Sequence, residues 1–145
     1  MSEAGNSGVG DGTRALVEEF MKRAGEGDPE RIAALFAERV DWMIAANPAV
    51  PWIRPRETRA DVAAHFTELA AGVAPLDGDG RAVSAIVVDG EEAVVTGELA
   101  GRVRATGKEF RSPFALRLTA DAETGELIRY HVYEDSLTVA AACRP

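Results

Sequence analysis

The chain has 145 residues, of which 46% are hydrophobic and 28% charged, which is enough for one globular domain with a packed core. Its formal net charge of -8 opposes binding to nucleic acid or to anionic membranes, because both need clustered Lys and Arg. The single cysteine, Cys143, excludes an internal disulfide framework and a cysteine-rich metal site. We therefore expect a cytoplasmic protein whose partner is a small molecule.

The first residues have the composition of a flexible tail. Residues 1–12 hold four glycines and no apolar run, which is unlike a signal peptide. We predict a disordered tail over 1–12 and one domain over 13–142. Thr13 is interpreted as the N-cap of a first helix, because apolar residues then recur at helical spacing as far as Ala24.

Two further helices and one strand are predicted before residue 73. Asp28-Pro29-Glu30 is typical of a helix start, with a cap, a proline at the first position and an acid in the first turn. Val40 to Ile44 has the alternation of a strand and leads into a proline-punctuated loop that carries Trp52. Thr58-Arg59-Ala60-Asp61 resembles a capping box and opens a third helix that ends at Gly72.

The second half of the chain has the pattern of strands joined by tight turns. Strands are predicted over 81–88, 93–105, 110–119 and 127–139, separated by Asp89-Gly90, Thr106-Gly107 and Thr124-Gly125. Short connections between long strands favour an antiparallel, strongly curved sheet. The predicted fold class is therefore α+β, a cone-shaped mixed or antiparallel sheet with three N-terminal helices over one face.

The last predicted strand carries the main candidates for chemistry. Strand alternation puts Arg129, His131, Tyr133 and Asp135 on one face. If that face is a cavity wall, it offers a set of proton-transfer groups, whereas if it meets solvent it is only a hydrated surface.

With these elements placed, the chain resembles the nuclear transport factor 2-like superfamily, and within it the SnoaL-like and ketosteroid-isomerase-like proteins. The resemblance rests on Gly27-Asp28, Leu35-Phe36-Ala37 before Val40-Asp41-Trp42, Phe66, Thr106-Gly107-Lys108 and the closing Tyr133-Glu134-Asp135. It implies a cone whose sheet and first helix enclose an apolar pocket. It also implies that the outer sheet face pairs two copies in a homodimer.

The resemblance also suggests roles for particular residues. Asp135 takes the position of the aspartate that closes the final strand in SnoaL-like cyclases, where it acts as general acid or base. Apart from the resemblance, His131 and Tyr133 lie on the same strand face and would polarise or position a ligand oxygen, or else be a packed or solvated histidine and a half-buried aromatic. Five aromatic residues are candidates for the pocket wall, although aromatics at these spacings are also typical of core: Phe20, Trp42, Trp52, Phe66 and Phe114. Trp52, in its proline-rich loop, is expected at the pocket rim or in a lid. His65 is expected at the boundary of the apolar stripe of the third helix and not as a catalyst.

The chain also departs from known enzymes of this kind. The position of the ketosteroid isomerase tyrosine holds Phe20, and that of its catalytic aspartate falls near Ile44. The central strand lacks the Arg-x-Asp of limonene-type epoxide hydrolases, and two histidines with one terminal cysteine give no metal-binding spacing.

The predicted function is a cofactor-free and metal-free cyclase or isomerase. It would act by general acid-base catalysis on a hydrophobic, polyketide- or terpenoid-like molecule, with Asp135 moving the proton. One alternative is an epoxide hydrolase or dehydratase that uses the same pocket. The other is a non-catalytic ligand-binding or dimerisation module.

Overall fold

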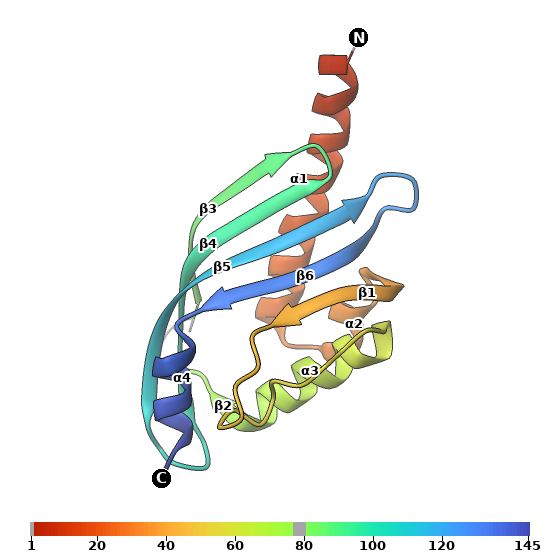
Figure 1. Ribbon diagram of the computed structural model, residues 1–145. Coiled ribbons are helices and arrows are strands. Elements are labelled where there is room, and N and C mark those ends of the chain that lie inside the picture. The colour runs from red at the N-terminus through yellow and green to blue at the C-terminus, as the bar shows by residue number, and fades with distance from the viewer. Residues whose placement is uncertain (1, 77–80) are drawn as a thin grey trace.

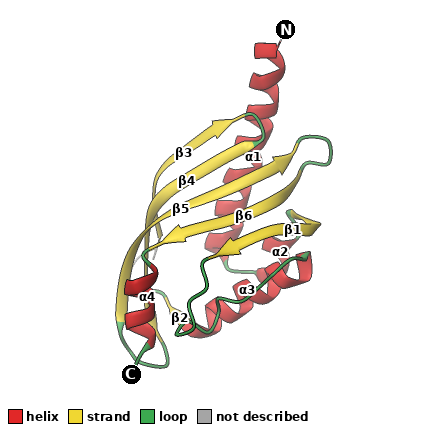
Figure 2. Ribbon diagram, viewed as in Figure 1, coloured by secondary structure: helices red, strands yellow, loops and turns green. Residues whose placement is uncertain are grey.

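The protein has one curved β-sheet with helices packed on one of its faces, as the computed structural model shows (Figures 1 and 2). The structure describes residues 2–76 and 81–145. The helices are α1 (Ser2–Glu26), α2 (Pro29–Ala33), α3 (Arg59–Gly72) and α4 (Ser136–Cys143). The strands are β1 (Phe36–Ile44), β2 (Val73–Ala74), β3 (Arg81–Asp89), β4 (Glu92–Val103), β5 (Glu109–Asp121) and β6 (Glu126–Glu134). The predicted α+β class is confirmed.

The sheet is mixed, with β1 as an edge strand. Its order is β1-β6-β5-β4-β2, and β3 also pairs with β4. The β1-β6 pair is parallel and the other pairs are antiparallel. The three predicted hairpin turns are confirmed by positive φ angles at Gly90, Gly107 and Gly125, which glycine tolerates without strain.

The sheet bends sharply where β4 passes from β3 to β2. A Cβ atom at Gly97 would lie 2.1 Å from the Ala82 carbonyl oxygen, so only glycine allows this approach of the two strands. The register between β3 and β4 also shifts between Val83 and Ala85. A bulge beside a glycine increases local curvature, and here it produces the concave face that holds the core.

The N-terminal helix is longer than the sequence predicts. Helix α1 begins at Ser2, so the predicted disordered tail over 1–12 is helical from residue 2 onward, while Met1 lies outside the described residues. Thr13 is therefore inside the helix and is not its N-cap. Its hydroxyl donates to the Val9 and Gly90 carbonyls, and Arg14 donates to the Ile86 carbonyl. These contacts hold α1 against β3 and its turn, while Figure 1 shows the start of the helix extending beyond the sheet.

The caps of the next two helices confirm the sequence prediction. Asp28 accepts from the backbone N–H groups of Glu30 and Arg31 at the start of α2. Thr58 and Asp61 form a reciprocal capping box at the start of α3. Figure 1 shows α1 crossing one face of the curved sheet, with α2 and α3 beside β1.

The C-terminus differs from the predicted long strand over 127–139. Strand β6 ends at Glu134, and a fourth helix, α4, follows. Asp135 is the N-cap residue of α4, because its carboxylate accepts from the Thr138 backbone N–H and hydroxyl. The helix packs into a second apolar cluster with Val50, Trp52 and Val103, which closes the end of the sheet.

Candidate functional site

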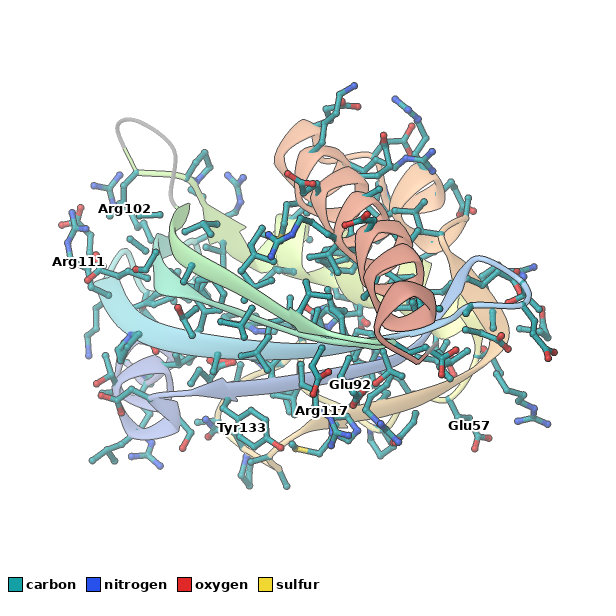
Figure 3. All side chains as sticks on the ribbon, turned by 90° about the horizontal axis from the view of Figure 1, so that it is seen from above. Glu57, Glu92, Arg102, Arg111, Arg117 and Tyr133 are labelled. Carbon is teal, nitrogen blue, oxygen red and sulfur yellow. The ribbon has the colours of Figure 1, made fainter. Side chains whose placement is uncertain are left out.

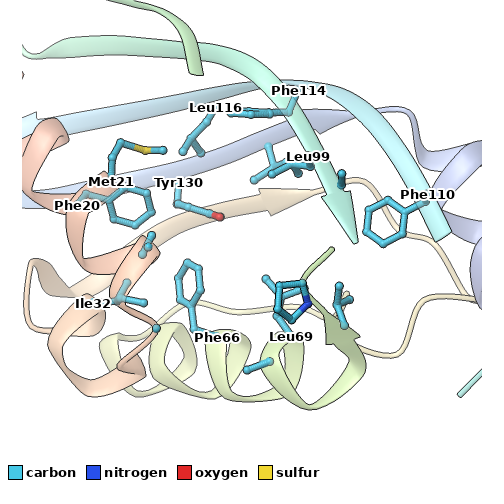
Figure 4. A pocket seen from close by; sticks show the side chains of 18 residues that line it. Phe20, Met21, Ile32, Phe66, Leu69, Leu99, Phe110, Phe114, Leu116 and Tyr130 are labelled. Atoms are coloured by element: carbon cyan, nitrogen blue, oxygen red, sulfur yellow. The ribbon is translucent and has the colours of Figure 1, made fainter. Parts of the chain in front are cut away.

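An apolar cavity of about 340 Å³ lies between the concave face of the sheet and helices α1 and α3. Its wall includes Phe20 and Met21 of α1, Phe66 of α3, Leu99 of β4, Phe114 of β5 and Tyr130 of β6. Among the described lining residues, the Tyr130 hydroxyl is the one polar side-chain group. Figure 4 shows this hydroxyl pointing into the cavity. The volume is at the lower end of the range of small-molecule sites.

Tyr130 is held in place by a cluster of aromatic rings. The Trp42 indole stacks on it with ring centroids 4.3 Å apart, and Phe20, Phe36 and Phe66 meet it edge to face at 5.9 to 6.1 Å. Tyr130 is 7% exposed. Such packing fixes the direction of the phenol, so the hydroxyl has a defined position at the cavity wall.

His65 of α3 is buried behind this cluster. Its ring lies 4.8 Å from Trp42 and 4.9 Å from Phe66, and the residue is 3% exposed. Burial, assisted by the positive charge of Arg56, lowers the pKa of His65 to about 4. The imidazole is therefore neutral at physiological pH. The prediction of a boundary residue is wrong, because the helix turns His65 inward between Trp42 and Trp52.

Glu134 is the ionisable side chain that the sequence analysis missed. It pairs with Phe114 across β5 and β6, and residues directly opposite each other share one face of a sheet. It therefore lies on the cavity side, one inward position beyond Val132. Its side-chain carboxyl has no hydrogen-bond or ion-pair partner among the described residues. Burial raises the pKa of the Glu134 carboxyl above its ordinary value of 4.5.

The predicted catalytic face of β6 is on the other side of the sheet. Arg129 pairs with Asp41 at 2.9 Å, and the His131 Nε2 atom lies 3.0 Å from the same carboxylate. Hydrogen bonding with His131 and then Arg129 lowers the pKa of Asp41. Tyr133 is 52% exposed, and Figure 3 shows it with Arg117 on the face opposite α1.

Of the two possibilities that the sequence left open for this face, the structure shows the hydrated surface and not the cavity wall. Strand alternation separated the two faces correctly, but the inward one carries Tyr130, Val132 and Glu134. The catalytic roles of His131 and Tyr133 stay predictions that their placement does not favour. The homodimer that the resemblance implies on this outer face also stays a prediction.

Asp135 is exposed, and its hydrogen bonds stabilise the start of helix α4. Hydrogen bonds from Thr138 lower the pKa of its carboxyl, which is opposite to the shift that a buried acid-base residue needs. Its backbone N–H donates to the Ser112 hydroxyl at 2.8 Å. Its predicted catalytic role is untested, and the geometry gives it the role of a helix cap.

The five predicted wall aromatics fall into two groups. Phe20, Phe66 and Phe114 line the cavity. Trp42 stands behind Tyr130, and Trp52 is buried in the second apolar cluster, where it packs against Gly72. Trp52 is therefore not a lid or rim, because the proline-rich loop folds it under α4.

The described residues contain neither a cluster of metal-ligating side chains nor a membrane-spanning helix. No group of three or more His, Cys, Asp or Glu side chains in 2–76 and 81–145 could hold a metal ion. No helix in that part of the chain has both the length and the apolar character needed to cross a membrane.

The chain belongs to the SnoaL-like domain family, whose model matches residues 17–130. This match, together with the fold, confirms the predicted membership of the nuclear transport factor 2-like superfamily. No curated protein matches the chain.

Solved structures share the fold at low sequence identity. An NTF2-like protein from Burkholderia xenovorans is 23% identical, with a TM-score of 0.79, over 92% of this chain and 97% of that one. TsrD from Streptomyces laurentii is 20% identical, with a TM-score of 0.69, over 92% and 95%. A protein with a ketosteroid isomerase-like fold from Catenulispora acidiphila, in complex with trimethylamine, is 14% identical, with a TM-score of 0.69, over 88% and 91%. At these identities the likeness concerns the fold alone.

Proposed function

We propose that the protein binds a neutral hydrophobic molecule in the cavity and rearranges it by proton transfer, as an isomerase or cyclase does. The observation that carries the proposal is the cavity wall itself, which is apolar apart from the Tyr130 hydroxyl. No charged side chain among the described lining residues could balance a phosphate or carboxylate, so a neutral ligand fits best. A compact polyketide- or terpenoid-like molecule with one oxygen has these properties.

In this proposal Tyr130 and Glu134 divide the chemistry. The phenol donates a hydrogen bond to the ligand carbonyl and stabilises the negative charge that develops there. The Glu134 carboxylate removes a proton from an acidified carbon, the C–H electron pair passes into the enolate, and the same carboxyl returns the proton to another carbon. The two residues are separated by about 13 Å along β6. Both side chains extend from the strand to the concave side, so the ligand would lie between them.

A second candidate is binding without turnover. Glu134 is absent from the residues that directly line the cavity, and this absence favours binding without turnover. Its neighbours Phe114 and Val132 do line the cavity. In that case the Tyr130 hydroxyl would orient a ligand and no proton would be exchanged.

The test needs no knowledge of the natural substrate. The neutral bicyclic ketone 2-tetralone has acidic C–H groups beside its carbonyl, and their exchange with D₂O can be followed by proton NMR. We expect the wild-type protein to accelerate this exchange above the buffer rate. Glu134→Gln should lower the accelerated rate at least 100-fold, because general-base catalysis contributes about 10² to 10⁴.

The matched control is the neighbouring carboxylate, changed as Asp135→Asn. Asparagine is an equally good N-cap, so this variant should fold and exchange like the wild type. Exchange that survives in Glu134→Gln and disappears in Asp135→Asn would contradict the proposal and restore the role first predicted for Asp135. Tetralone binding without accelerated exchange would favour the second candidate.

A further inference from the structure

A second hollow lies at the open edge of the sheet, on the far side of Trp42 from the cavity. It has a volume of about 300 Å³ and lies between the end of β1 and the loop over 46–55. Apolar side chains make up most of its wall, including Trp42, Ile44, Pro48 and Ile53. Arg54 lines it as well and is the one charged residue among the described wall residues. We call this hollow the edge cleft.

Arg54 at the edge cleft shares its carboxylate partner with a second arginine. Arg54 and Arg56 both pair with one carboxylate, that of Glu68. The Arg54 pair has an N–O distance of 2.8 Å, and its guanidinium side chain remains 58% exposed. Glu68 thus pairs with both guanidinium groups, and Arg54 keeps more than half of its side chain exposed beside the cleft.

Buried nitrogen atoms without partners lie around the same loop. The Arg56 side chain is 5% exposed, and its Nε atom has no hydrogen-bond partner among the described residues. The same holds for Nδ1 of His65, whose ring touches Trp42. Buried polar atoms are normally paired. Arg56 and His65 do not line the edge cleft themselves, but Arg56 shares the Glu68 carboxylate with Arg54, and the His65 ring contacts the wall residue Trp42. Both residues are tied to the loop through the Trp52 backbone.

We propose that the edge cleft is a second ligand site, distinct from the cavity, for a small carboxylate with an aromatic or branched aliphatic body. The carboxylate pairs with Arg54, whose planar guanidinium suits this geometry. The ligand body packs on Trp42, Ile44 and Ile53. The cavity offers no such cation among its described wall residues, so charge separates the two sites: the cavity takes neutral molecules and the edge cleft takes anions.

The chain contains natural reporters for the two sites. It has three methionines, of which Met21 lines the cavity and Met43 lines the edge cleft. With ¹³C-methyl methionine, NMR titration distinguishes binding at the two places. The probe is 4-fluorophenylacetate, and its uncharged counterpart is 4-fluorophenylacetamide.

We expect 4-fluorophenylacetate to shift the Met43 methyl signal and to leave Met21 in place. The amide should bind at least tenfold more weakly, and Arg54→Gln should weaken binding of the acid about tenfold, since a charge-assisted hydrogen bond is lost. The matched control is Arg39→Gln, which removes an exposed arginine paired with Glu57 outside the cleft and should leave the affinity unchanged.

Three results would overturn the proposal. They are no Met43 shift at millimolar probe, equal affinity for acid and amide, or an Arg54→Gln variant that binds like the wild type. A shift at Met21 alone would place the probe in the cavity and would also refute the second site. None of these results bears on the tetralone exchange, so the two proposals can fail separately.

Discussion

The two faces of β6 carry residues of similar chemical type in very different surroundings. On the outer face Arg129, His131 and Tyr133 form ion pairs or meet solvent. On the inner face Tyr130 and Glu134 stand in apolar surroundings, where a phenol keeps a fixed direction and a carboxyl has its pKa raised. The comparison shows that the polarity of a strand face does not reveal a site. A few polar groups on the mostly apolar face are better candidates, because burial changes their chemistry.

The largest expected effect is on stability, at the two tyrosines. Tyr130→Ala should lower the free energy of unfolding by about 3 to 5 kcal/mol, since it removes a buried ring from the aromatic cluster. Tyr133→Ala should change it by less than about 1 kcal/mol, because that ring is largely exposed. Urea denaturation of both variants checks this difference. Equal losses would mean that the inner and outer faces have been assigned wrongly.

The next effect is the pH dependence that His65 contributes. Its pKa is about 4 in the folded protein and 6.5 ordinarily, so between these values only the unfolded chain binds the proton. The neutral imidazole therefore contributes fully to the free energy of unfolding above pH 6.5. That contribution falls by about 3 kcal/mol as the pH drops to 4. His65→Phe should remove this part of the pH slope in urea unfolding. The outer-face variant His131→Gln is the comparison, and a slope that follows His131 would contradict the account.

Glu134 should act in the opposite direction and more weakly. The pKa of the Glu134 carboxyl is raised in the folded protein. Below about pH 4.5 the carboxyl is protonated in both states and its burial has no pH-dependent cost. As the pH rises from there through the folded pKa, the unfolded chain is favoured and the protein loses stability. Glu134→Gln should therefore be more stable than the wild type at pH 7.5 and no more stable at pH 4. Thermal unfolding at the two pH values checks this. A variant less stable than the wild type at pH 7.5 would show that the carboxylate has a partner.

The smallest effect is expected on the outer face. Arg129→Ala removes ion pairs with Asp41 and Glu92 that are open to water. We expect a loss of about 1 kcal/mol or less, which shrinks further when unfolding is measured in 1 M salt. A large, salt-independent loss would show that this network is buried, for instance by a second copy of the chain.

Local sequence signals predicted the parts of the fold that local chemistry determines. Asp28 and Thr58 cap helices where their motifs stand, and Gly90 turns a hairpin through its positive φ. The sequence-based predictions of the fold were wrong where contacts between residues far apart in the chain determine the local structure. Ser2 to Gly12 is helical although glycine disfavours helices, and Thr13 and Arg14 tie this helix to the β3-β4 hairpin.

The site was predictable only in part for the same reason. Phe20, Phe66 and Phe114 line the cavity because their helix and strand faces point inward, as their spacing indicated. Trp52 could not be placed, since its position depends on α4, which packs against the loop. The sequence did contain a signal for Tyr130 and Glu134. Both lie two positions from the apolar Val132, so strand alternation puts all three residues on the same, inward face. The sequence analysis instead placed its candidates on the polar face of that strand.

The central claim is that the inner face of β6 binds the ligand, and one matched pair of variants tests it directly. Tyr130→Phe and Tyr133→Phe each remove a single hydroxyl from the same strand. Calorimetric titration with 2-tetralone should show affinity about 2- to 10-fold weaker for Tyr130→Phe, the effect of one hydrogen bond, and unchanged for Tyr133→Phe. Weaker binding in Tyr133→Phe with wild-type affinity in Tyr130→Phe would contradict the account and place the ligand on the outer face.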